Sequence, residues 1–308
     1  MLTIFASPKA FTGEFDTIQR NAVASWTRLR PPPQVLLIGN EPGTAAVCRE
    51  LGVEHVPDVR VNNFGTPFAD SVIELAEQRA RHPFLLWIAA DTILCDDVTA
   101  ALEEVSRRFE RFCMIAGRYR LPRPAPIDFD DPHWQADVRG AAIGPLVGDV
   151  PAGDFFLFPR SFWGRFPPFV EGRTAIDGWM LFRTLESGAA LVDATSAVMT
   201  IHQDHAYGHH PHGEAGVWFG PEARHNLALA GKRLLTRENA DWMLTPKGLR
   251  RPPRSFRRHV AWCAQVAAFH PRVGWPFRVY RYIVERAFLR PAAARADARA
   301  RRPGAGVL

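Results

Sequence analysis

Short, continuous apolar runs alternate with segments of helical periodicity in the first half of this 308-residue chain. The runs at residues 3–6, 35–38 and 84–88 show no alternation of polar and apolar residues, which is typical of strands buried on both faces. Between them, apolar residues recur at helical spacing, as in residues 16–29. Buried strands separated by helices predict an α/β fold with a mostly parallel sheet covered on both sides.

The composition fits a folded chain with a basic end. Hydrophobic residues make up 47% of the sequence, and the net charge of +6 is concentrated in an Arg-rich, acid-poor segment from Arg250 onward. The four cysteines show no CxxC spacing, which argues against a zinc knuckle or a disulfide framework. The sequence begins without a secretory signal and has no long apolar segment, so we expect a cytoplasmic protein.

The pattern changes twice along the chain. We expect an α/β domain at residues 1–225, a helical basic extension at 226–290 and a disordered tail at 291–308. Within the first domain, residues 121–152 are rich in Pro, Gly and Asp and are interpreted as a long functional loop. Trp134, Trp163 and Trp179 are either core residues or stacking platforms for sugar rings.

Polar side chains follow the predicted strands, at the edge of a parallel sheet where ligands bind. Among them, Asp91 directly follows the run Phe84–Ile88. Neither a dinucleotide fingerprint nor a P-loop is present, so a metal or side chains would have to hold any phosphate group. Asp91 has two interpretations: a ligand of a divalent cation, or part of a helix cap together with Asp96 and Asp97.

Two later segments favour the first interpretation. Asp177 stands at the start of a predicted helix at residues 177–187, and His202 stands at the end of a predicted strand at 197–201. Four more histidines follow between His205 and His212, but their spacing does not suit a standard tetrahedral zinc site. We interpret this His-rich segment as a loop covering an active site.

These parts, taken in order, resemble a glycosyltransferase of the GT-A fold, in the broad family-2-like group. The resemblance covers residues 2–205 and rests on the opening strand, the Asn-rich loop at 62–66, the strand ending in Asp91, the helix start at Asp177 and the final His202. It implies a central mixed, mostly parallel sheet flanked by helices. It also implies a nucleotide-diphosphate sugar as the donor and Mn²⁺ or Mg²⁺ as the cofactor.

The resemblance also implies roles for individual residues. Asp91 matches the last acid of a DxD motif, which binds the metal, whereas Ala89 replaces the first acid. His202 matches a further metal ligand. Asp177 matches the general base that accepts the proton of the acceptor hydroxyl in inverting members, although Ile176 replaces the preceding Glu. The residues expected to contact the donor are Pro8, Lys9, Asn40, Glu41, Asn63, Gly65 and Asp154.

The sequence therefore predicts sugar transfer to a hydroxyl of a glycan, lipid or small-molecule acceptor, with metal dependence and inversion. Two alternatives stay open: a sugar nucleotidyltransferase, and a degenerate domain of this fold that binds a carbohydrate or a partner without catalysis. The mixture of arginines and aromatic residues beyond Arg250 suits peripheral contact with the inner face of a membrane. No nucleic-acid-binding motif accompanies it.

Overall fold

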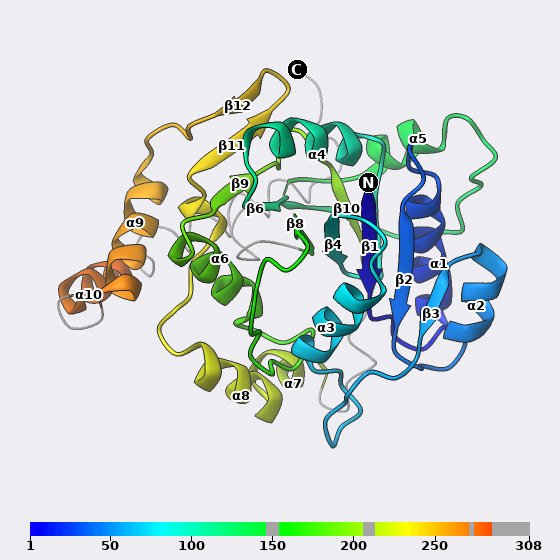
Figure 1. Cartoon of the computed structure of the whole chain (residues 1–308), viewed down its shortest axis with the longest axis horizontal. Helices are drawn as coiled ribbons and strands as arrows, with labels where there is room; N and C mark the ends of the chain where they lie inside the picture. The colour runs from blue at the N-terminus through cyan, green and yellow to red at the C-terminus, as the bar shows by residue number, and fades with distance from the viewer. Residues whose placement is uncertain (146–153, 206–212, 271–273, 285–308) are drawn as a thin grey trace.

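The computed structural model describes residues 1–145, 154–205, 213–270 and 274–284. At the centre of this described part lies a nine-stranded sheet in the order β12-β11-β9-β6-β8-β4-β1-β2-β3 (Figure 1). Its strands are β1 Leu2–Ala6, β2 Gln34–Ile38, β3 Glu54–Val56, β4 Phe84–Ile88, β6 Phe112–Ile115, β8 Phe155–Pro159, β9 Ala190–Asp193, β11 Trp242–Thr245 and β12 Gly248–Arg250. All run in one direction except β8 and β12, which are antiparallel to their neighbours.

Helices cover both faces of this sheet, so its strands are buried from two sides. In β1, Ile4 packs on the face covered by α1, α2 and α4, while Phe5 packs on the face covered by α3 and α6. The predicted α/β fold, a mixed and mostly parallel sheet flanked by helices, is therefore confirmed. The bounds of these helices are α1 Glu14–Thr27, α2 Thr44–Leu51, α3 Ala69–Arg79, α4 Asp97–Arg108 and α6 Ile176–Glu186.

A second, three-stranded sheet lies beside the carboxyl ends of the central strands. It consists of β5 Thr92–Ile93, β10 Thr200–Gln203 and β7 Arg118–Leu121, in that order. Strand β10 is antiparallel to β5 and parallel to β7. Its apolar side packs on α5, Trp134–Ala141, through Ile93, Leu121 and Ile201. The region expected to be a long loop at residues 121–152 thus contains a helix, and its residues 146–153 lie outside the described part.

The segment beyond residue 225 differs from the expected all-helical extension. Helix α8, Pro221–Ala230, crosses this boundary, and β11 pairs with β9, so the central sheet continues into the segment. The reason is that the short runs at Trp242–Thr245 and Gly248–Arg250 form a hairpin on the sheet edge left open by β9. The helices α9 Phe256–Phe269 and α10 Trp275–Val284 follow. The tail at 291–308 lies outside the described residues, and the predicted domain boundary remains a prediction.

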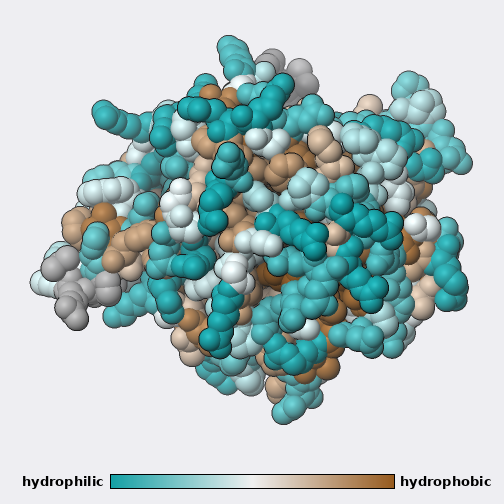
Figure 2. Space-filling view, in the orientation of Figure 1, coloured by the Kyte–Doolittle hydropathy of each residue, from teal (hydrophilic) through white to brown (hydrophobic). Residues whose placement is uncertain are grey.

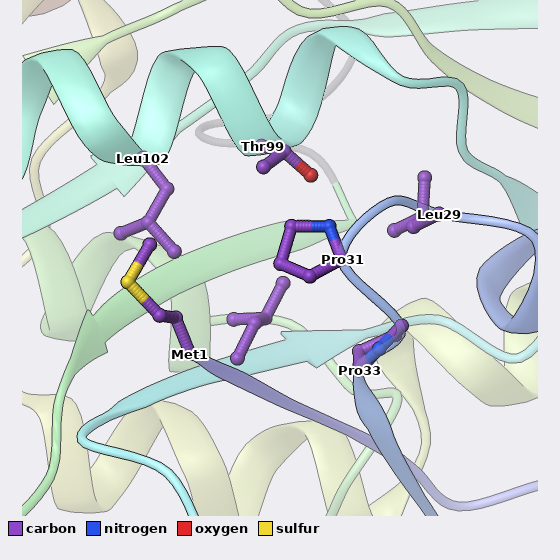
Figure 3. A pocket seen from close by; sticks show the side chains of 7 residues that line it. Met1, Leu29, Pro31, Pro33, Thr99 and Leu102 are labelled. Carbon is purple, nitrogen blue, oxygen red and sulfur yellow. The ribbon is translucent and has the colours of Figure 1, made fainter.

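A small apolar pocket lies at the opposite edge of the sheet, where β1 and β2 begin (Figure 3). It is lined by Met1, Leu2, Leu29, Pro31, Pro33, Thr99 and Leu102. No charged side chain lines it, so it offers no group for acid–base or metal chemistry. Among the described helices, none is long and apolar enough to cross a membrane.

Candidate active site

Three charged residues meet at one edge of the central sheet because of the directions of three neighbouring strands. Asp91 follows the carboxyl end of β4, and Arg118 follows that of β6. Strand β8 lies between them and runs the other way, so Asp154, which precedes it, comes to the same edge. The amide N–H of Ala89 donates to the carbonyl of Asp154 over 3.1 Å and fixes the two loops together.

The small sheet adds two histidines to this edge. Because β10 pairs with β5, His202 lies opposite Thr92, the residue after Asp91. The Nδ1 atom of His202 lies 3.1 Å from Oδ1 of Asp91, and Nε2 of His205 lies 3.2 Å from its Oδ2. The carbonyl of Asp91 accepts hydrogen bonds from the backbone and the side chain of Gln203 at 3.2 and 3.0 Å. The expected pairing of Asp91 with His202 is therefore present in the fold.

The donor set suits a divalent cation. The ligand atoms of Asp91, His202 and His205 all lie within 4.8 Å of one another. The His202 Nδ1 atom is buried, and among the described residues no group makes a hydrogen bond of proper direction to it, despite the short distance to Asp91. A buried nitrogen without a hydrogen-bond partner is costly unless something else engages it, and a metal ion would do so.

The carboxylate of Asp91 and the imidazole of His202 each favour the charged form of the other. Burial alone would raise the pKa of Asp91, but His202, His205 and Lys9 hold that pKa well below its ordinary value. Burial lowers the pKa of His202, yet Asp91 and Asp154 overcome this and raise it to about 9. Without a cation, the proton on His202 thus takes the place of positive charge beside Asp91, and a bound metal competes with that proton.

Asp154 is held by a two-pronged ion pair. Arg118 donates from Nε and Nη2 to the two carboxylate oxygens of Asp154 at 2.7 and 2.6 Å. Although burial would raise the pKa of Asp154, Arg118 and His202 lower it to about 2. The structure thus places this predicted sugar contact inside the charged cluster, with its orientation fixed by Arg118.

Lys9 lies near the carboxylates of this cluster, and Arg173 lies near Lys9. Burial and the nearby Arg173 lower the pKa of Lys9, while Asp91 and Asp154 oppose this effect. The Lys9 ammonium lies 4.4 Å from the centre of the Phe15 ring. Arg173 is held by Glu222 of α8, with Nε 2.8 Å from the Glu222 Oε2 atom. Lys9 therefore lies within electrostatic reach of the metal-ligand carboxylate.

Asp177 lies in the first turn of α6 and is half-buried. Burial of this group and the negative charge of Asp154 raise its pKa to about 7, and Arg118 only partly offsets them. A carboxyl group with such a pKa is able to accept or release a proton near neutral pH. The residue predicted as general base is thus close to Asp154 and has the titration range that this role needs.

The other predicted donor contacts lie on the loops that follow the first strands. Pro8 is buried after β1, Asn40 is exposed and Glu41 half-buried after β2, and Asn63 is exposed. Gly65 adopts a φ of 81°, in the left-handed region that favours glycine. Their roles stay predictions.

In the loop at residues 62–66, the asparagine whose side chain makes hydrogen bonds within the described structure is Asn62 rather than Asn63. Its Oδ1 accepts from the amides of Phe64 and Thr66 at 2.8 and 3.0 Å, and its Nδ2 donates to Glu222 at 2.5 Å. These bonds tie the loop to α8, on the same carboxylate that holds Arg173.

The cap interpretation of the acidic run after Asp91 is wrong. Neither Asp96 nor Asp97 makes a side-chain hydrogen bond that caps α4. Asp97 instead accepts from Arg139 of α5 at 2.7 Å and from the amide of Met199 at 3.1 Å. Asp97, the first residue of α4, therefore connects that helix to α5 and to the segment that enters β10. Of the two interpretations of Trp134, Trp163 and Trp179, the structure supports the first: they are core residues, between 2% and 8% exposed.

The sequence did not single out four further titratable residues in this region: His205, Arg118, Arg173 and Glu171. His205 was one of five clustered histidines, and its H-x-x-H spacing from His202 was the available signal. Arg118 and Arg173 carried no motif. Glu171 accepts from Nε1 of Trp87 at 3.0 Å, and burial raises its pKa to about 7. The remaining histidines of the cluster, His209, His210 and His212, lie outside the described residues.

Comparisons with known proteins give likenesses of fold only. No family model and no curated protein matches the chain. Glucosyl-3-phosphoglycerate synthase from Mycobacterium tuberculosis, solved with Mg²⁺ and UDP, is similar at 13% identity and a TM-score of 0.47, covering 76% of this chain and 79% of that one. GalNAc-T7, solved with UDP, GalNAc and Mn²⁺, is similar at 13% identity and a TM-score of 0.49, covering 75% and 48%.

S. aureus TarS 1-349, solved with UDP-GlcNAc, is similar at 10% identity and a TM-score of 0.46, covering 66% of this chain and 58% of that one. At such identities the likeness does not assign an activity, and the function has to be argued from the site itself.

Proposed function

We propose that this protein is a glycosyltransferase of the GT-A fold that moves a sugar from a nucleotide-diphosphate donor to an acceptor hydroxyl. The observation that supports this most strongly is the convergence of Asp91, His202 and His205 beside Lys9 at the carboxyl edge of the sheet. Asp91, His202 and His205 would hold a divalent cation, which neutralises the diphosphate of the leaving group when bound. Lys9 would add a second positive charge for the same diphosphate.

The donor set favours Mn²⁺ over Mg²⁺. Mg²⁺ prefers oxygen ligands and water in near-ideal octahedral geometry, whereas imidazole nitrogens suit transition metals. Two of the three proposed ligands are imidazoles. His205 thereby supplies a third ligand in a chain where Ala89 replaces the first acid of the DxD motif.

Asp177 is proposed as the general base. Its carboxylate accepts the proton of the acceptor hydroxyl while the hydroxyl oxygen bonds to the anomeric carbon of the donor. The bond from that carbon to the diphosphate oxygen breaks in the same step, so the sugar configuration inverts. A carboxyl pKa of about 7 allows Asp177 to be ionised before the step and to hold the proton after it.

A donor screen tests this proposal. Release of nucleoside diphosphate from UDP- and GDP-sugars is measured with Mn²⁺ and with Mg²⁺, in wild type, Asp91→Ala, Asp177→Ala and the matched control Asp96→Ala. Asp96 lies on the surface beside Gln135, so the control should turn over like wild type. We expect loss of turnover in the first two variants and higher turnover with Mn²⁺. Unchanged turnover in both active-site variants would refute the mechanism.

The same screen separates catalysis from binding alone. A degenerate domain would bind a nucleotide sugar without releasing the diphosphate, and a nucleotidyltransferase would need a sugar phosphate and a nucleoside triphosphate. The acceptor is proposed to be a glycan, lipid or small molecule with a free hydroxyl, and the place of action the cytoplasm.

A further inference from the structure

The two C-terminal helices form a hairpin whose inner side is fixed to the body of the protein. On α9, Val260, Cys263 and Ala264 are buried. Asn239 of the 3₁₀ helix Arg237–Asn239 donates to the carbonyl of Ala261 at 2.7 Å, and Phe269 packs on Phe182 of α6 with ring centres 4.7 Å apart. The hairpin is thus packed against the rest of the protein, at the left end of the molecule in Figure 1.

In the described part of the chain, Phe277 and Tyr280 of α10 make ring contacts with α9. Phe277 packs against Trp262 with ring centres 6.0 Å apart, and Tyr280 packs against His259 at 6.1 Å. Residues three apart share a face of a helix, so these two define the side of α10 that faces α9. The opposite side of α10 points away from this contact.

That opposite side is apolar and exposed. Trp275, Val279, Tyr282 and Ile283 follow helical spacing for one face and are 61%, 49%, 60% and 56% exposed. Trp262 and Phe256 of α9 are also exposed. Hydrophobic surface is visible over α9 and α10 in Figure 2. A contiguous exposed apolar face of this kind marks a surface that binds something.

The positive charge of the segment that carries this face indicates an anionic partner. Between Arg250 and Val284 the sequence has eight arginines and neither Asp nor Glu. Ion pairs to Glu238 and Asp241 engage Arg251, Arg257 and Arg258, which leaves the segment with a net positive charge. A second copy of the chain in a symmetric dimer would bring two such positive segments together, and like charges facing each other are unfavourable.

We infer that the exposed face of α10, together with Trp262 and Phe256, binds the surface of an anionic membrane. Trp and Tyr side chains suit the boundary between lipid headgroups and acyl chains, and arginines attract anionic headgroups. Ten helical residues span about 15 Å, half the thickness of a bilayer core, so α10 would lie in the plane of the surface.

Vesicle co-sedimentation tests this inference with the full-length protein and without donor or cation. Vesicles of phosphatidylcholine are compared with vesicles that also contain phosphatidylglycerol. We expect binding to the anionic vesicles alone, weakened by added salt. The double variant Trp275→Ser/Tyr282→Ser should bind roughly tenfold less. Phe219→Ser, which removes an exposed aromatic side chain from α7, Gly213–Phe219, is the matched control and should bind like wild type.

Equal binding by the double variant and wild type, or equal binding to neutral vesicles, would overturn the inference. So would a dimer, seen by analytical ultracentrifugation, that the double variant abolishes. Circular dichroism and unchanged thermal unfolding establish that the variants fold. Because the assay contains no donor and no cation, its result is independent of whether the protein transfers sugars.

Discussion

His202 and Asp91 lie 3.1 Å apart although they are far apart in the sequence, and the pairing of β10 with β5 brings them there. The carboxylate belongs to the connection between β4 and β5, and the imidazole belongs to strand β10 of the small sheet. Their contact, together with His205 on the other carboxylate oxygen, defines the position of the proposed cation.

Replacing Asp91 with alanine should weaken Mn²⁺ binding at least tenfold, because the carboxylate is the one charged ligand of the set. Isothermal titration calorimetry on the protein without donor measures the affinity directly. Asp96→Ala removes an exposed carboxylate five residues away and should leave the affinity unchanged. If Asp91→Ala bound Mn²⁺ as well as wild type, the proposed site would be wrong.

His205→Ala should lower Mn²⁺ affinity by roughly ten- to a hundredfold and narrow the preference for Mn²⁺ over Mg²⁺. The variant removes one of the two imidazole nitrogens that favour a transition metal. Electron paramagnetic resonance of Mn²⁺ titrated into the protein reports the bound fraction. His225→Ala is a suitable control, since His225 lies on α8 and contacts the carbonyl of Pro168. An unchanged metal preference would exclude His205 as a ligand.

Asp177→Asn should reduce turnover by about a hundred- to ten-thousandfold, the range for loss of a general base. In wild type, turnover should rise with pH through about 7, because the pKa of Asp177 is raised to about 7 and only the ionised form accepts a proton. The residual activity of the variant should lack this rise. A pH profile of the variant that still rises at pH 7 would assign the titration to another group.

Asp177→Asn should lower turnover but raise the thermal stability of the protein at alkaline pH. The pKa of Asp177 is about 7 in the fold and near 3.8 when unfolded, so between these values the folded state binds the extra proton. The stability that this bound proton contributes is fully present below pH 3.8 and is lost as the pH rises to 7. Asp177→Asn should therefore unfold at a higher temperature than wild type at pH 8 but not at pH 4. Scanning calorimetry at both values checks this, with Asp96→Asn as control.

Arg118→Ala should destabilise the fold by about 3 kcal/mol, since it leaves the largely buried carboxylate of Asp154 without its two-pronged partner. Arg183→Ala is the matched control, because Arg183 pairs with Glu186 on the surface of α6. An exposed pair of this kind contributes less than about 1 kcal/mol. Urea denaturation gives both values, and equal values would show that the buried pair is not structurally important.

The order of buried strands and helices was predictable because it depends on local periodicity. Strand β4, Phe84–Ile88, has the predicted bounds, and the buried runs predicted at residues 3–6 and 35–38 lie within β1 and β2. Strand β6 was not predicted, because its four residues, Phe112–Ile115, are a short apolar run that begins soon after α4, and such a run does not by itself distinguish a strand from a buried helical segment. Its identity as a strand depends on its neighbours β8 and β9.

The candidate site could be proposed from the sequence where a residue stands at the end of a predicted element, but not where pairing between distant segments brings a residue in. Asp91, Asp177 and His202 were proposed from their places at the ends of predicted elements, and their roles stay predictions. Arg118 comes to the site through β7 and β6, and His205 comes through the register of β10. The sequence contains no local signal for such pairings.

Because the two-residue strand β5 begins directly after Asp91, this residue connects the large sheet to the small one. Asp91 lies in the short connection between β4, which ends at Ile88, and β5, which begins at Thr92. His202 belongs to the small sheet alone. Anything that bridges the two side chains therefore opposes separation of the small sheet from the large one. Amide hydrogen exchange in Thr92, Ile93 and Ile201 would slow as a cation fills the site, so that occupancy and local rigidity are read from the same three amides.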